Sequence, residues 1–522
     1  MLKFQWMILS LRIIIVPAWI IFYLFADLRL SYAHGFGDRY DLPVPLNWYL
    51  FGAGTVVALS FLFVSVFVRI TNQRRRFYSL SIGSSLPFQL IIFKGFVPLV
   101  KGSSVLLFLF LILGGFVGSQ EPSQNIGPTL VWIILWVGLI YFNALVFNLW
   151  IILNPWKNIY SLFYVLFTGS RSNLFYSGKY NYPNSLKKWP ALVLLFIFLW
   201  LEIVFPNSGS PVYISVLAIN YSILTFLGMY LFGPINWLSN GEFFSVTFRL
   251  LSKCAPVVVS LSSVEECRDC SQCRYDQENC FDCEYCFDQS STSSKRFKLR
   301  KFASGLYGSQ ASHLSEIFFV LMLLASVTFD GFSETPTWAN IVSLGILFAG
   351  DLVNYPVLLI STVGLVSSFL IFVVVYFLTC FVASKAVASK YSTEGISNIL
   401  VYSLIPIAVG YHIAHYFSFL LVQGQSMIYL ISDPMGLGWD LFQTSTYKVY
   451  VGVVNAKAAW FVGILAILAG HITAVYASHY ASLIKFSEYP LVIRAQRVML
   501  IMMVAYTIAG LWILAQPIIK TP

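Results

Sequence analysis

Residues 356–383 read PVLLISTVGLVSSFLIFVVVYFLTCFVA and contain no charged side chain. An α-helix of about 20 apolar residues is long enough to cross the ~30 Å hydrocarbon core of a bilayer. This stretch therefore predicts a transmembrane helix. It decides the fold because similar stretches recur along the whole chain.

The other apolar stretches have comparable length and are separated by polar or basic segments. With residues 356–383 included, the expected spans are approximately 9–27, 48–69, 103–118, 129–153, 190–206, 211–232, 314–330, 356–383, 397–421, 457–481 and 496–516. Backbone polar groups must be satisfied inside a bilayer, so we expect an all-α fold, a polytopic transmembrane helix bundle of about 10 to 11 spans.

Two weaker apolar segments do not fit this pattern. Residues 80–100 are interrupted by Pro87, Lys94 and Pro98, and we expect them to lie at the membrane interface rather than to cross it. Residues 338–350 are too short to cross a bilayer and are followed by Asp351. We interpret them as a re-entrant or interfacial piece.

Composition supports a membrane protein. Of the 522 residues, 58% are hydrophobic and 10% are charged, whereas soluble proteins average roughly 25% charged residues. The net charge of +10 comes from basic residues that lie between the apolar stretches and form no continuous stripe. Nucleic-acid binding is therefore not expected, and the lipid bilayer is the expected partner.

The distribution of Lys and Arg predicts the orientation. The loops assigned to the outside hold only Arg29, Arg39, Lys448, Lys457 and Lys520, and the opposite loops hold many more. Positively charged loops face the cytoplasm, so we expect a multi-pass protein of the cell inner (cytoplasmic) membrane. The expected organisation is an N-terminal bundle over 34–232, a cytoplasmic loop over 233–313 and a C-terminal bundle over 314–522.

The N-terminus has two interpretations. Lys3 and Arg12 precede an apolar segment, and Ser-Tyr-Ala at 31–33 is a cleavage signal of small residues, so residues 1–33 are either a signal peptide or an uncleaved first anchor. Cleavage would make His34 the first residue and would offer its amine and its imidazole to one metal ion. That arrangement resembles the copper-binding histidine brace of periplasmic copper carriers and of the particulate methane monooxygenase family. The alternative is an ordinary loop histidine.

The loop EECRDCSQCRYDQENCFDCEYCFD at 265–288 predicts a metal site. Two CxxCxxC triplets contain six of the eight cysteines of the chain: Cys267, Cys270, Cys273, Cys280, Cys283 and Cys286. A two-residue gap lets neighbouring thiolates bind one ion, as in zinc and iron–sulfur sites. One zinc, a binuclear zinc cluster and an iron–sulfur cluster all fit this spacing. A reducing cytoplasm disfavours disulfides.

Three histidines lie within two consecutive apolar stretches. His412 and His415 share one helix face, and His471 lies on the next span, which is antiparallel, so His412 and His471 are expected to meet near mid-depth. Such residues favour a metal ion, copper for example, a haem or a proton relay. The alternative is hydrogen bonding between packed helices. Glu202 and Asp330 are expected at span ends, solvated at the interface, and the alternative for Asp330 is a place in a site at the outer face.

Several blocks resemble a family of bacterial polytopic membrane proteins that is sometimes labelled fenitrothion hydrolase. The residues that carry the resemblance are AHGFGDRYDLPVPLNWYLFGAG (33–54), FGPINWLSNGEFFSVTFRLLSKCAP (232–256), TFDGFSETPTW (328–338), AHYFSFLLVQGQ (414–425), SDPMGLGWDLF (432–442) and GHITAVYASH (470–479). The label implies organophosphate hydrolysis, but the sequence contains no recognisable hydrolytic triad or paired-metal constellation to match it.

Three functions remain open at this level. The first is a redox metalloprotein in which the cysteine cluster passes electrons to a partner and the histidines hold a metal or haem. The second is a transporter or permease with structural zinc in the cysteine cluster. The third is a structural subunit of a larger membrane complex.

Overall fold

The computed structural model describes residues 45–68, 80–82, 91–169, 178–261, 274–276, 279–281, 283–307, 309–349, 354–388, 390–486 and 488–516. Three predicted features lie outside these residues: the expected first span at 9–27, His34, and the cysteines Cys267, Cys270 and Cys273. The predictions made for them are therefore untested.

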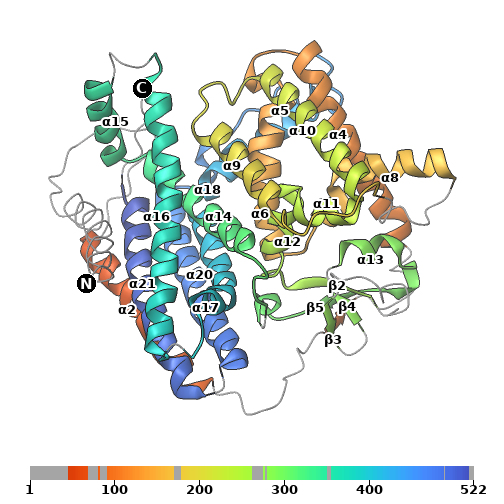
Figure 1. Cartoon of the computed structure of the whole chain (residues 1–522). Helices are drawn as coiled ribbons and strands as arrows, with labels where there is room; N and C mark the ends of the chain where they lie inside the picture. The colour runs from red at the N-terminus through yellow and green to blue at the C-terminus, as the bar shows by residue number, and fades with distance from the viewer. Residues whose placement is uncertain are drawn as a thin grey trace.

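Long apolar helices dominate the part of the chain that the structure describes (Figure 1). Nine helical stretches there have the length and composition to cross a membrane. They are α2 (Leu46–Phe67), η1–α4 (Ile91–Val117), α5–η3–α6 (Ile126–Leu145), α10 (Pro211–Phe232), α14 (Leu314–Ser333), α16 (Pro356–Ala386), α17–η7–α18 (Thr393–Gln423), α20 (Ala456–Lys485) and α21 (Tyr489–Leu514). This confirms the prediction of a multi-pass helical bundle.

The two shorter apolar segments form helices that are too short to cross a bilayer unaided. Helix α9 (Trp189–Ile203) has 15 residues where a span was expected, and α15 (Pro336–Ala349) has 14 where a short piece was expected. The interfacial assignment of residues 80–100 is wrong for its second half. Residues 91–96 form a π-helical segment, η1, which continues directly into α4 (Val97–Val117). Pro98 lies just after the change from π-helix to α-helix, in the first turn of α4.

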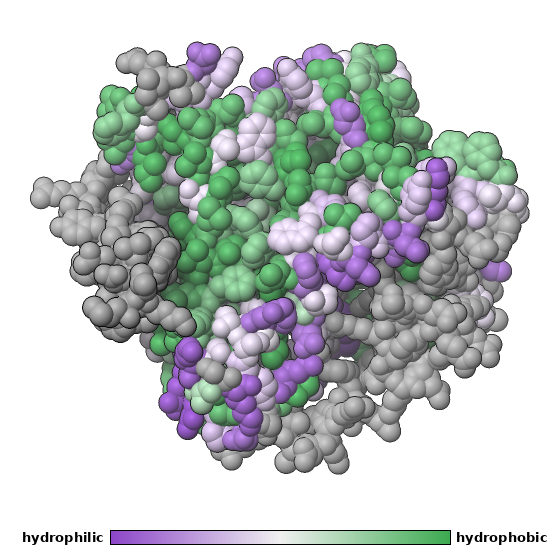
Figure 2. All heavy atoms as spheres, in the orientation of Figure 1, coloured by the Kyte–Doolittle hydropathy of each residue, from purple (hydrophilic) through white to green (hydrophobic). Residues whose placement is uncertain are grey.

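The burial of the helices separates a core from a surface that suits lipid. Few residues of helix α16 are buried, whereas the stretch α17–η7–α18 is almost wholly buried. Figure 2 shows hydrophobic residues covering much of the visible face over the helices, with hydrophilic residues gathered toward its lower part. Exposed leucines such as Leu113 on α4 and Leu370 on α16 add to this surface. These helices therefore present apolar side chains suited to contact with a bilayer.

A small antiparallel sheet lies at one end of the bundle (Figure 1). Its strand order is β1–β5–β2–β4–β3, with β1 at Leu80–Ile82, β2 at Val257–Leu261, β3 at Arg274–Asp276, β4 at Asn279–Phe281 and β5 at Lys295–Leu299. The expectation of an all-α chain is therefore wrong in this region. The β-branched run at 257–259 favours a strand, but strands this short give little signal in the sequence.

The segment 233–313 was expected to be a cytoplasmic loop, but part of it belongs to the helical bundle. Helices α11 (Pro234–Asn240) and α12 (Phe243–Leu251) pack into the bundle, where Phe243, Phe244 and Phe248 are buried. The fully buried Glu242 begins α12, and its carboxylate accepts hydrogen bonds of 2.8 Å from the Phe244 and Ser245 amides. A further hydrogen bond comes from the Tyr221 hydroxyl. The bundle therefore extends past residue 232.

Helices α18 (Ile405–Gln423) and α20 cross with their backbones in contact. A Cβ atom added to Gly470 would lie 2.6 Å from the Pro406 carbonyl oxygen and 3.4 Å from the Gly410 Cα. Close crossings at small residues are common between membrane helices. The crossing places His412 and His471, one or two residues away from these glycines, at a similar depth.

Candidate functional site

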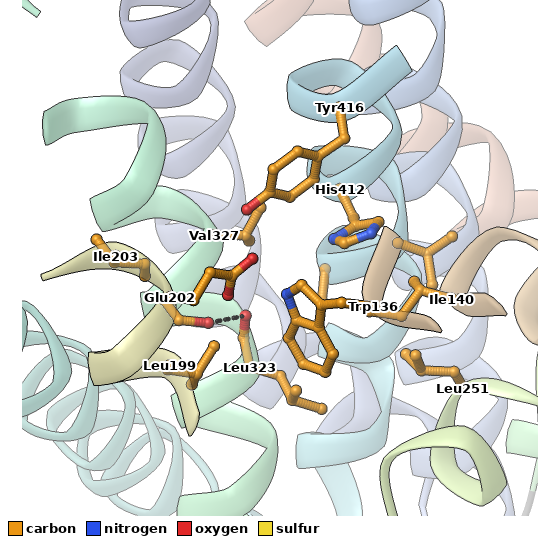
Figure 3. A pocket seen from close by; sticks show the side chains of 13 residues that line it. Trp136, Ile140, Leu199, Glu202, Ile203, Leu251, Leu323, Val327, His412 and Tyr416 are labelled. Atoms are coloured by element: carbon orange, nitrogen blue, oxygen red, sulfur yellow. Dashed lines mark hydrogen bonds between the residues drawn. The ribbon is translucent and has the colours of Figure 1, made fainter. Parts of the chain in front are cut away.

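A pocket of about 30 Å³ lies between α9, η3, α6, α12, α14 and α18. Its lining is mostly apolar, with a few polar side chains. The residues are Trp136, Ile140, Leu199, Glu202, Ile203, Leu251, Leu323, Ser326, Val327, Ala408, Val409, His412 and Tyr416 (Figure 3). A cavity that holds one water molecule needs roughly 10–15 Å³ of accessible space. The pocket therefore has room for one or two species the size of water.

Each polar side chain comes from a different part of the bundle. Glu202 lies in the last turn of α9, and Trp136 lies in the π-helical segment η3 (Thr129–Gly138). His412 and Tyr416 are four residues apart on α18 and so share one face of that helix. Segments of π-helix are rare and occur often at functional sites. Figure 3 shows Glu202, Trp136, His412 and Tyr416 arranged around a common gap.

Two buried atoms of this pocket have no hydrogen-bond partner among the described residues. They are Oε2 of Glu202 and Nε2 of His412, a residue that is only 5% exposed. A buried polar atom left unpaired costs roughly 1–3 kcal/mol. Unpaired groups of this kind need an explanation, and a bound water, ion or ligand is one. Both atoms belong to side chains that line the same small space.

A second polar group adjoins the pocket through Tyr416. One oxygen of Asp330, in the last turn of α14, accepts hydrogen bonds from the Tyr416 hydroxyl at 2.5 Å and from His415 Nε2 at 2.8 Å. The Asp330 and His415 side chains are each 19% exposed. Both carboxylates lie at the ends of their helices, as expected. Asp330 is also bonded within the bundle, so solvation alone does not account for it.

The three predicted cofactor histidines do not face one another. The ring of His412 packs against Trp136, Tyr141 and Tyr416. The ring of His471 packs against Tyr411 and Tyr506, and its Nδ1 lies 2.9 Å from the Ile467 carbonyl oxygen. His412 and His471 both lie near the α18–α20 crossing, but their rings point to different neighbours, so the expected meeting of the two is not found.

His415 is also separate from His412 and His471. Its Nε2 is hydrogen-bonded to Asp330, and the Tyr416 ring lies against the rings of both His412 and His415. Among the residues that the structure describes, no three His, Cys, Asp or Glu side chains are grouped to hold a metal ion. A shared metal or haem at His412, His415 and His471 stays a prediction without geometric support. Both ring nitrogens of His479 have partners, Gln496 Oε1 at 2.7 Å and the Val68 carbonyl at 3.0 Å.

The second triplet of cysteines lies between a strand and a short helix. Cys280 is in β4, opposite Leu261 of β2 and Tyr275 of β3. Cys283 precedes α13 (Glu284–Gln289) and Cys286 lies within it, and both cysteines are buried. With the first triplet outside the described residues, metal binding by the six cysteines stays a prediction.

Two lysines tie α13 to the bundle. The carboxylate of Asp288 lies 2.7 Å from Lys101 Nζ of α4 and 2.8 Å from Lys157 Nζ of α8 (Pro155–Thr168). Burial alone would raise the pKa of Asp288, but Lys157 and Lys101 outweigh it and lower the pKa to about 2. The Lys157 side chain is only 1% exposed, so this is a buried ion pair. The helix that carries Cys286 is therefore held firmly against the membrane helices.

No family model, curated protein or solved structure matches this chain. The resemblance to the family labelled fenitrothion hydrolase stays a prediction. The pocket is therefore the best guide to function. The sequence indicates a role for His412 but places Glu202 only at the interface and gives no signal for Trp136. The signal for Glu202 is its position as an acidic residue at the end of an apolar stretch.

Proposed function

We propose that this chain is a membrane transporter whose substrate site is the pocket around Glu202 and His412. The observation that carries the proposal is the pair of buried, unpartnered atoms, Glu202 Oε2 and His412 Nε2, on the lining of one pocket. A solute that hydrogen-bonds to both atoms removes the cost of burying them. Ionisable residues inside membrane proteins commonly mark the paths of substrates, ions or protons.

We propose a route from the pocket to solvent past its acidic neighbours. Glu202 and Asp330 lie in the last turns of α9 and α14, so both mark the C-terminal ends of these helices. Tyr416 lines the pocket, and its hydroxyl donates a hydrogen bond to Asp330. Asp330 in turn pairs with His415, and both side chains are partly exposed. We propose that solutes enter past this pair and that this end faces outward in the inner membrane. The sheet and the cysteines then face the cytoplasm.

Uptake by the purified protein in liposomes tests the proposal. The variant Glu202→Gln keeps the shape of the side chain and removes its charge, and we expect it to abolish uptake of the transported solute. The matched control is Glu488→Gln, because Glu488 is 59% exposed and pairs with Lys390 far from the pocket. If the double variant Glu202→Gln/His412→Gln takes up the solute at the rate of the wild-type protein, the pocket is not the substrate site.

A metal centre with a redox role is a second candidate. The observation that favours it is the burial of Cys283 and Cys286 beside the strand that contains Cys280. These residues would hold zinc or an iron–sulfur cluster together with the first triplet, and an electron-transfer partner or membrane-complex subunit would dock there. Elemental analysis with an absorption spectrum tests this candidate. Absence of zinc, iron and copper and of any haem or iron–sulfur band would refute it.

A further inference from the structure

The size of the pocket limits what it can hold. About 30 Å³ admits one or two species the size of water. An ammonium ion or methylammonium fits this space as it stands, whereas tetramethylammonium, a sugar or an amino acid requires the surrounding helices to move apart. The occupant is therefore a very small molecule or ion.

The hydrogen-bonding capacity of the lining favours a donor. An ionised carboxylate oxygen only accepts hydrogen bonds, and a neutral imidazole that carries its proton on Nδ1 accepts at Nε2. Burial opposes the charge of Glu202 unless a cation lies beside it. With such a cation bound, Glu202 Oε2 and His412 Nε2 both accept, so the occupant donates at least two hydrogen bonds. Imidazole nitrogen suits transition metals, whereas hard cations prefer oxygen ligands, so the pair of acceptors discriminates against sodium and potassium.

The charge and the rings of the lining favour a cation. Glu202 is the acidic residue of the lining, and Lys and Arg do not occur among the residues that surround the pocket. Trp136 and Tyr416 both lie against His412, with ring centroids 6.4 Å and 4.6 Å from its own. Both residues line the pocket, and aromatic rings attract cations that approach their faces, tryptophan most strongly.

We infer that the pocket binds an ammonium-type cation, ammonium itself or a small primary alkylammonium, between the Glu202 carboxylate and His412 Nε2. The ion donates its N–H groups to these two acceptors and lies against the Trp136 and Tyr416 rings. This inference rests on the proposed transport function and names the class of its substrate.

Uptake of radiolabelled methylammonium by proteoliposomes tests the inference. The lumen and the medium are held at equal pH, and protein-free liposomes are run in parallel, because the neutral amine crosses lipid unaided. We expect protein-dependent uptake that ammonium inhibits and that sodium, potassium and tetramethylammonium do not. Glu202→Gln should lower uptake at least tenfold, and Glu488→Gln should leave it unchanged.

Trp136→Phe provides a second measurement. It keeps an aromatic ring but weakens the attraction for a cation, so we expect the KM for methylammonium to rise roughly two- to fivefold with little change in kcat. Size-exclusion chromatography confirms that each variant is folded.

The outcomes separate the two proposals. If another solute is taken up in a Glu202-dependent manner and methylammonium neither enters nor competes, the ammonium inference is wrong and the transport proposal stands. Equal inhibition by potassium and by ammonium would also overturn the inference. If the pocket holds water only, neither methylammonium nor any other solute depends on Glu202, and both proposals fail.

Discussion

The crossing of α18 and α20 gives the sharpest test of the packing. A methyl group added at Gly470 would lie 2.6 Å from the Pro406 carbonyl oxygen, and one added at Gly410 would lie 2.5 Å from the Ala466 carbonyl oxygen. Ordinary van der Waals contact begins near 3.4 Å. Both obstacles are backbone atoms, which cannot rotate away as the end of a side chain can. The helices must therefore separate by roughly 0.8 Å to accept Gly470→Ala.

The expected magnitude follows from two opposing effects. Overpacking of a well-packed contact costs about 1–3 kcal/mol, and replacing glycine by alanine within a helix returns up to about 1 kcal/mol. Because the obstacles are rigid, we expect Gly470→Ala to lower the free energy of unfolding by about 1–2 kcal/mol. The double variant Gly410→Ala/Gly470→Ala should cost less than the two single variants added together, since one separation accommodates both methyl groups.

Reversible unfolding in mixed micelles, with the SDS fraction as denaturant and circular dichroism as readout, measures these differences. The matched control is Gly102→Ala in α4, where an added Cβ would have no atom within 4 Å. We expect this control to be neutral or slightly stabilising. If Gly470→Ala is as stable as Gly102→Ala, the close crossing of α18 and α20 is refuted.

Three further predictions concern the polar contacts. Lys157→Met leaves the buried Asp288 with one cationic partner and should destabilise the docking of α13 by about 3 kcal/mol, seen as faster amide hydrogen exchange over 284–289. Lys101→Met should have a smaller effect, because Lys101 is 31% exposed. Unchanged exchange in Lys157→Met would contradict the ion pair. Asp330→Asn weakens the hydrogen bonds from His415 and Tyr416 and should lower the free energy of unfolding by about 2 kcal/mol. Thermal unfolding in detergent measures this change, and an unchanged midpoint would disprove it. Removal of bound metal with a chelator should expose Cys283 and Cys286 to thiol reagents, and equal labelling before and after chelation would count against a metal at these cysteines.

The sequence by itself determined which segments form the long helices. Residues 211–232 were expected and found as one helix, and the span expected at 356–383 is helical over 356–386. The spacing of the cysteines also identified a candidate metal site. Both properties are local, because the length of an apolar stretch and the gap between two ligands are visible in a short window of sequence.

Only the tertiary structure decided which side chains meet. The pocket joins Glu202 on α9 with His412 on α18, and β1 pairs with β5 although more than two hundred residues separate them. Every face of an apolar helix is equally soluble in lipid, so hydrophobicity cannot say which face turns inward. That choice depends on close contacts such as Gly410 against Gly470, which set His412 and His471 at a similar depth but toward different neighbours.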